Sequence, residues 1–146
     1  MFYRFYLAGS NRMDDLALNL SEYLSGQADI IRGEDELVTC TESFTLRITQ
    51  RGTTLQFASE DYGVKFKYCY WFDIIISSGS WAEDLMRLVN HILTKFQDDC
   101  VLEANGDKPI LQRESGELYI DRNIGDGSFP FDRLVSKYVE RKLVRE

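Results

Sequence analysis

The chain has few of the side chains from which most active sites are built. It contains a single histidine, His91, and three widely separated cysteines, Cys40, Cys69 and Cys100, with no CxxC pair. This supply argues against a zinc site of the usual spacing and against a disulfide framework. We expect the cysteines to be small, half-buried side chains of a reducing cytosol. A nucleophilic cysteine would need a histidine beside it, which only His91 could supply.

Basic side chains and long apolar runs are scarce as well. Lys and Arg number 17 against 24 Asp and Glu, which gives a formal net charge of −7. Such a negative field disfavours nucleic acid as a partner and favours a basic protein. No apolar run approaches the roughly 20 residues of a spanning helix, and Met1 to Leu7 contains Arg4 and lacks a signal-peptide core. We therefore expect a cytoplasmic protein with no membrane association.

Proline is limited to two residues, and the composition otherwise lies inside the globular range. Hydrophobic residues make up 44% and aromatic residues 13% of the 146 residues, which is enough for one core in an ordered chain. The sequence shows no internal repeat, no low-complexity stretch and no linker rich in Pro, Gly or Ser. We predict a single domain over residues 1–146.

Strand-like segments come in groups joined by short turns. In the longest, Val64 to Ile76, apolar side chains alternate with more polar ones at a period of two. Grouped strands favour an antiparallel sheet with helices packed on one face, so the predicted class is α+β. We expect about six strands and three helices in the order strand, helix, three strands, helix, two strands, helix. Eight segments have strand character, which is more than the number of strands in this order: Phe2 to Leu7, Leu37 to Thr41, Phe44 to Thr49, Thr54 to Ala58, Val64 to Ile76, Val101 to Ala104, Ile110 to Arg113 and Leu118 to Asp121.

Two helices are predicted in the first hundred residues from apolar side chains at helical spacing. The first follows Asn11, which we predict as its N-cap, and stops at Gly26. The second begins after Ser80, with Glu83 three residues later as a capping box. Its apolar stripe from Trp81 to Phe96 makes it the main core helix.

A third helix is predicted after a loop at residues 123–128, which we expect to be mobile. It begins at Pro130 and carries apolar side chains as far as Leu143. The loop contains Gly125-Asp126-Gly127-Ser128, but it has no GxxxxGK or GxGxxG pattern and no lysine placed to reach a phosphate. No cofactor is therefore expected.

Clustered acids at the ends of predicted elements are candidates for contact with a partner. They do not follow the spaced DxDxDG pattern of a calcium loop, and adjacent acids in loops are usually solvated, so we predict no metal site and no catalytic residue. Such acids can instead steer and hold a basic partner, although they also serve solubility. The candidates are Glu34, Asp35, Glu36, Glu60, Asp61, Asp98 and Asp99.

Trp71 is a further candidate for partner contact. It lies on the more polar face of the long strand, where an aromatic ring is either covered by a helix or offered to a partner. Residues 130–146 carry more basic than acidic side chains, so the negative surface is expected to lie away from them.

The second half of the chain resembles a known family. Gly63-Val64-Lys65-Phe66 precedes the main helix, and Val101-Leu102-Glu103-Ala104-Asn105-Gly106 leads through Ile110-Leu111-Gln112-Arg113 to Gly116-Glu117-Leu118-Tyr119-Ile120. This succession is similar to immunity proteins of bacterial polymorphic toxin systems, above all those attached to swarm-inhibition toxins, in which the pattern xLxxNGxxxxLxRxxGxLxxN recurs. Asp121 stands where that pattern ends on asparagine, and Pro109 interrupts the hairpin. The resemblance covers Gly63 to Asp121.

The resemblance implies a small cytosolic protein that binds a cognate toxin domain and blocks it without chemistry. We expect a monomer or weak dimer that occludes the active or substrate-binding surface of a basic toxin. If the toxin is a nuclease, acids in its substrate groove would mimic phosphates, and salt or charge reversal at Glu34 to Glu36 would weaken binding. The contact residues do not follow from the family, because immunity proteins meet their toxins through variable surfaces.

Two other classes stay open. A secretion chaperone of the type III class would bind an unfolded effector segment as a homodimer, and an apolar face left free on Ser80 to Gln97 would favour it. An enzyme would need a pocket that gathers His91, one cysteine and a carboxylate.

Overall fold

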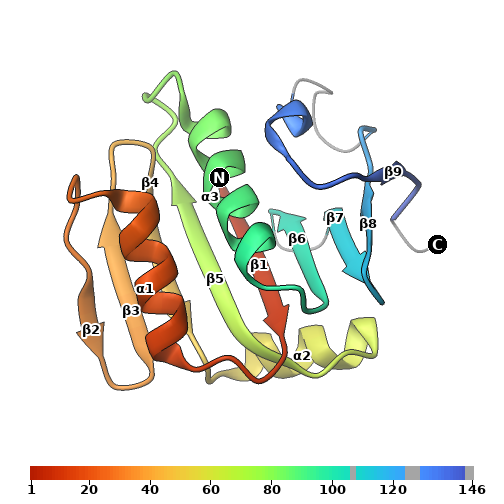
Figure 1. Cartoon of the computed structure of the whole chain (residues 1–146), viewed down its shortest axis with the longest axis horizontal. Helices are drawn as coiled ribbons and strands as arrows, with labels where there is room; N and C mark the ends of the chain where they lie inside the picture. Colours follow the sequence, from red (N-terminus) through yellow and green to blue (C-terminus); the bar gives the residue numbers. More distant parts are fainter. Residues whose placement is uncertain (106–107, 124–128, 144–146) are drawn as a thin grey trace.

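The computed structural model, which describes residues 1–105, 108–123 and 129–143, has one mixed sheet of nine strands. The strand order is β2-β3-β4-β5-β1-β6-β7-β8-β9 (Figure 1). Neighbours are antiparallel except for β8 and β9, which are parallel. The prediction of an α+β protein is confirmed, but the sheet is larger than the six strands expected. The strands are β1 (Phe2–Ala8), β2 (Ile31–Gly33), β3 (Glu36–Cys40), β4 (Phe44–Thr49), β5 (Phe66–Ile74), β6 (Cys100–Ala104), β7 (Lys108–Glu114), β8 (Glu117–Ile120) and β9 (Val139–Glu140).

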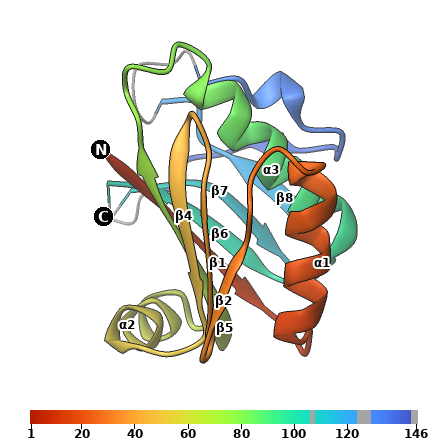
Figure 2. The ribbon, with the colours of Figure 1, turned by 90° about the vertical axis from the view of Figure 1, so that its left-hand side faces the viewer.

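Helices cover both faces of this sheet. The described residues form α1 (Met13–Leu24), α2 (Thr53–Tyr62) and α3 (Trp81–Lys95), together with a short 3₁₀ segment, η1 (Phe131–Arg133). Figure 2 shows α1 and α3 on one face and α2 on the other. The expectation that all helices pack on one face is therefore wrong, and α2 is the one helix that the described residues place on the second face.

The main core lies between the sheet and helices α1 and α3. The apolar stripe predicted for the second helix is confirmed, since Leu85, Leu88 and Ile92 of α3 have no exposed surface. A second, smaller cluster lies under α2. It consists of Leu55, Ala58, Tyr6, Phe66, Cys69 and Val101.

A buried arginine closes the C-terminal end of α3. Arg113 of β7 is only 4% exposed, and its guanidinium donates to the carbonyl oxygens of Phe96 (2.6 Å) and Leu93 (3.1 Å). The last carbonyls of a helix have no partner inside the helix and carry partial negative charge, so a cation is favourable there. Arg113 thus joins α3 to β7 across the core.

The segment Thr54 to Ala58, predicted as a strand, belongs to α2. Leu55, Ala58 and Tyr62 recur at helical spacing, and all three pack on the second cluster. The segment is short and contains β-branched and aromatic side chains, which favour strands by propensity. Packing against the apolar patch on the sheet favours the helix, because helical spacing places these three side chains on one side, whereas a strand would divide them between two faces.

The prediction of a last helix that begins at Pro130 is also wrong. A single 3₁₀ turn buries Phe131, the chain then extends, and β9 pairs with β8. The N–H of Arg141 continues this pairing by donating to the carbonyl of Ile120 at 2.9 Å. Without β9, the backbone groups of β8 would form an open sheet edge, which favours pairing over a helix. Residues 124–128 of the loop predicted before this segment lie outside the described residues.

The N-terminal caps differ from those predicted. Arg12, and not Asn11, is the N-cap of α1, and its backbone N–H donates to Asp15 Oδ2 at 2.8 Å. At α3, Ser80 is the N-cap as predicted, but its hydroxyl donates to Asp84 at 3.2 Å and the capping box with Glu83 does not form.

Candidate partner-binding surface

The seven acidic candidates lie at one end of the strands, where the register places residues 34–36 and 98–99 and where α2 carries Glu60 and Asp61. At the start of β3, Glu36 pairs with Thr49 at the end of β4. Leu7, near the end of β1, pairs with Cys100 at the start of β6. This is the lower edge in Figure 1, where α2 also lies. We call these seven residues the acidic edge: Glu34, Asp35, Glu36, Glu60, Asp61, Asp98 and Asp99. Trp71, the eighth candidate, lies within β5.

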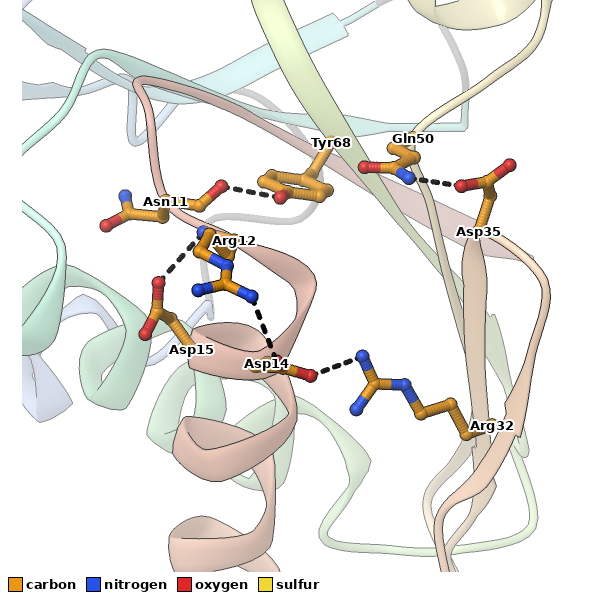
Figure 3. A network of polar contacts seen from close by, with 8 residues as sticks. All are labelled: Asn11, Arg12, Asp14, Asp15, Arg32, Asp35, Gln50 and Tyr68. Atoms are coloured by element: carbon orange, nitrogen blue, oxygen red, sulfur yellow. Dashed lines mark hydrogen bonds and ion pairs between the residues drawn. The ribbon is translucent and has the colours of Figure 1, made fainter.

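Two acids of the β2–β3 hairpin form ion pairs inside the protein. Asp35 lies 2.7 Å from Arg51 Nε and also accepts a hydrogen bond from the Gln50 side chain (Figure 3). Glu36 lies 2.6 Å from Arg47 Nη1. Their negative charge is therefore offset locally, which lowers what these two residues contribute to attracting a basic partner.

The start of α1 belongs to the same edge and was missed in the sequence. Asp14 pairs with Arg32 of β2 and lies 3.6 Å from Arg12 (Figure 3). The hydrogen bond from Arg32 lowers the pKa of the Asp14 carboxyl below its usual value. The signal in the sequence was the adjacent pair Asp14-Asp15, placed directly after the N-cap.

Glu34, Glu60 and Asp61 are the exposed members of the acidic edge. Within the described residues, neither Glu34 nor Glu60 enters an ion pair. They are therefore the carboxylates of this edge best placed to meet basic groups of a partner.

Asp98 and Asp99 hold the loop between α3 and β6 in place. Asp98 accepts a hydrogen bond from Asn11 Nδ2 at 2.7 Å, and Asp99 accepts one from the Ser115 backbone N–H at 3.0 Å. Gly9 lies against Asp98, since a Cβ at Gly9 would stand 2.4 Å from its carboxylate. These two acids have structural partners, which contact with another protein would have to preserve or replace.

Gly9 gives a test of this loop. We expect Gly9→Ala to lower the free energy of unfolding by about 2 kcal/mol, because φ is +105° and the new methyl group displaces Asp98 from Asn11. The matched control is Gly116→Ala, at φ +85° with open space around it, which should cost about 1 kcal/mol from backbone strain alone. Urea denaturation of both variants measures the difference, and equal losses would contradict the close contact with Asp98.

Trp71 lies in a stack on the sheet face that carries α2. Its ring is stacked on Phe2 with centroids 4.8 Å apart and planes at 8°. The guanidinium of Arg4 lies 5.3 Å from the Trp71 ring centroid. The indole N–H donates to Asp73 Oδ1 at 3.2 Å. Trp71 is partly buried, and Phe2 and Arg4 of the neighbouring strand pack against it. Tryptophan and arginine are among the residues most often found as anchors of protein interfaces.

A groove of about 420 Å³ runs beside Trp71 along strands β4 and β5. The first turn of α2 bounds it, and Arg51, which pairs with Asp35, also lines it, so the groove adjoins the acidic edge. We call it the Trp71 groove. On the two strands it is lined by Thr45, Arg47, Thr49, Cys69, Trp71 and Asp73.

A buried carboxylate ties α2 to the sheet. Glu103 of β6 is 6% exposed, accepts a hydrogen bond from Tyr62 at 2.6 Å and lies 3.7 Å from Arg4. Burial and the bond to Glu103 raise the pKa of Tyr62, because both favour the protonated phenol. Cys69, beside this group, is 5% exposed, and burial raises the pKa of its thiol to about 12. This network therefore acts in packing, and a thiol so protonated is a poor nucleophile.

His91 lines a separate cavity of about 860 Å³ between α1, α3 and the β3–β4 turn. Tyr23, Asp84 and Arg87 line it as well, but no cysteine does. The constellation of histidine, cysteine and carboxylate that an enzyme would need is not assembled around this cavity. In the described part of the chain, no group of three or more His, Cys, Asp or Glu side chains is placed to hold a metal ion.

Comparison with known families places the chain in one of them. The SitI3-like family matches residues 1–127, which covers most of the chain. The chain belongs to the SitI3-like family. This is an immunity-protein family of toxin systems, so the resemblance to swarm-inhibition toxin immunity proteins is confirmed. The search of curated proteins and the search of solved structures found no match.

The region shared with the SitI3-like family includes the acidic edge and the Trp71 groove. It begins with β1 and runs past β8, whereas η1 and β9 follow after it. Immunity proteins of this kind are generally non-enzymatic. Among the residues that the structure describes, no helix combines the length and the apolar character needed to span a membrane.

Proposed function

We propose that this protein binds a cognate bacterial toxin domain and neutralises it by occluding its active or substrate-binding surface. Membership of the SitI3-like family carries the proposal, since immunity proteins of toxin systems act on a toxin partner. Occlusion requires an extended surface and no catalytic group. The acidic edge and the Trp71 groove adjoin one another and supply such a surface.

The net charge of −7 supports a basic toxin as the partner. Glu34 and Glu60 project from the acidic edge, where they raise the local concentration of a positively charged protein. On this proposal the protein works in the cytoplasm, as a monomer or weak dimer, and Asp35, Glu36, Asp61, Asp98 and Asp99 form the surroundings of the contact.

The chaperone alternative receives no support from the main helix. An apolar face free for self-association was the feature that would favour it. The apolar side chains of α3, among them Leu85, Leu88 and Ile92, lie in the core against the sheet.

Co-expression tests the proposed function directly. A candidate cognate toxin domain is expressed in a host with and without the protein, and the purified pair is analysed by light scattering. Rescue of growth with a stoichiometric complex is expected. A host that dies equally with and without the protein, or a homodimer that binds only an unfolded segment, would overturn the proposal.

Electrostatic steering makes a separate prediction. We expect the double variant Glu34→Lys/Glu60→Lys to associate with the toxin domain roughly tenfold more slowly at low ionic strength, because steering acts on the association rate. The difference should vanish near 0.5 M salt, where screening is strong. The control pair Glu22→Lys/Glu42→Lys makes the same change in charge on exposed residues away from the acidic edge. Stopped-flow measurement of both pairs decides, and equal rates would refute steering by this edge.

A further inference from the structure

The Trp71 groove has the features of a docking point for one particular kind of side chain. We infer that it receives a lysine or arginine of the toxin domain, which stacks on Trp71 and pairs with Asp73. The inference rests on the proposed function, because it names the place and the chemistry of toxin contact. Three observations support it: the charge of the groove, the aromatic stack and the shape.

The groove has one carboxylate without a cationic partner. Its two arginines are already paired, Arg47 with Glu36 at 2.6 Å and Arg51 with Asp35 at 2.7 Å. Asp73 is exposed and accepts a hydrogen bond from the Trp71 indole, and in the described residues it enters no ion pair. The groove therefore has an unbalanced negative charge at Asp73, which complements a cation and repels an acidic side chain.

The aromatic stack is suited to a cation. Arg4 already lies 5.3 Å from the Trp71 centroid and 5.6 Å from that of Phe2, which shows that a guanidinium packs here. The face of an indole attracts cations more strongly than other aromatic rings do. A partner side chain that reaches Asp73 past Trp71 would gain both this contact and an ion pair, while its alkyl stem covers the ring.

The shape of the groove limits what can enter. A volume of about 420 Å³ is near the lower end of ligand pockets, so it suits one or two side chains and not a helix or a strand pair. Thr45 pairs directly with Asp73 in the sheet register, so the two side chains lie next to each other on the same face of the sheet. Arg51 connects this groove to the acidic edge, where a basic protein would first be attracted.

Two substitutions close the groove to a cation without touching the core. Asp73→Lys reverses the charge, and Thr45→Arg places a guanidinium opposite Asp73 so that the site is filled from within. Both should weaken the complex with the toxin domain that the wild-type protein neutralises by at least about tenfold in Kd. The controls are Glu42→Lys and Thr94→Arg, which make the same changes in charge at exposed positions outside the groove. Isothermal titration calorimetry measures all four, and circular dichroism checks their folding.

A direct report comes from the fluorescence of Trp71. The variant Trp81→Phe leaves Trp71 as the only tryptophan, because the chain has two. Addition of the toxin domain should then reduce quenching of Trp71 by acrylamide severalfold, since a docked side chain shields the ring. Unchanged quenching in a saturated complex would overturn the inference, whatever the affinities of the variants.

The outcomes separate this inference from the proposed function. If wild-type protein binds and neutralises the toxin while Asp73→Lys and Thr45→Arg bind as tightly as the controls, the toxin docks elsewhere and only the groove assignment fails. If the wild-type protein forms no complex with the toxin domain, the proposed function itself fails. Loss of binding in the two groove variants alone, together with shielding of Trp71, supports the docking point.

Discussion

Replacement of Arg113 by methionine should lower the free energy of unfolding by about 3 kcal/mol. Methionine keeps much of the apolar stem of arginine, but it removes the two charge-assisted hydrogen bonds to Phe96 O and Leu93 O. The carbonyls at the end of α3 would then be buried without partners. Urea denaturation at neutral pH measures the loss from the shift in midpoint at constant slope.

The matched control for Arg113 is Arg133→Met. Arg133 forms its ion pair with Glu83 at the surface, where such pairs contribute little, so this variant should unfold almost as wild type does. A stability of Arg113→Met within about 0.5 kcal/mol of wild type would contradict the role assigned to Arg113. An intermediate value for Arg113→Lys is expected, because a lysine cannot bridge two carbonyls as a guanidinium does.

The free energy of unfolding should fall steeply as the pH rises above 9. Burial raises the pKa of Cys69 and of Cys100 to about 12, whereas a thiol in the unfolded chain titrates near 9. Between these values the unfolded state has lost protons that the native state keeps, so the free energy of unfolding falls as pH rises. Each thiol contributes up to about 1.4 kcal/mol per pH unit in this window. Burial also raises the pKa of Tyr6 and Tyr70, which adds to the loss above pH 10.

The double variant Cys69→Ala/Cys100→Ala isolates the contribution of the thiols. It will be less stable at neutral pH because two buried side chains are shortened, but its stability should depend less on pH. Between pH 9 and 10 the slope should be flatter than wild type by about 2 kcal/mol per pH unit. Urea titrations at pH 7, 8, 9, 10 and 11 give both slopes. Parallel curves would show that these thiols are not the groups responsible.

The elements with strong internal periodicity were predictable from the sequence. Phe44 to Thr49 alternates strictly and is β4 to the residue, and the stripe from Trp81 to Phe96 is α3 with its N-cap at Ser80. Both bury a continuous set of large apolar side chains, so local pattern and tertiary packing favour the same structure.

The wrong secondary-structure predictions concern segments whose local pattern is short, so that packing or pairing with the sheet determines their conformation. Thr54 to Ala58 became a helix because α2 covers the apolar patch around Tyr6 and Phe66. The segment after Pro130 became η1 and β9 because β8 offered an unpaired edge. β2 has three exposed residues and no apolar alternation, so its sequence did not predict a strand.

The candidate site was likewise predictable only in part from the sequence. The sequence named the seven acids and Trp71, but it could not show that strand register and the position of α2 gather the acids on one edge. It also could not show that Arg47 and Arg51 offset Glu36 and Asp35, since those pairs join residues of different elements. Asp73 was seen only as one polar position of the long strand.

By itself, the sequence determined the net negative charge, the α+β class, the main core helix and the family resemblance, which depend on composition and on patterns within single segments. The tertiary structure alone decided which face of the sheet stays partly open, which acids keep an unbalanced charge and where Trp71 meets Asp73 in a groove. These features arise from contacts between residues distant in the chain, and the energy of such contacts is not encoded in any local pattern.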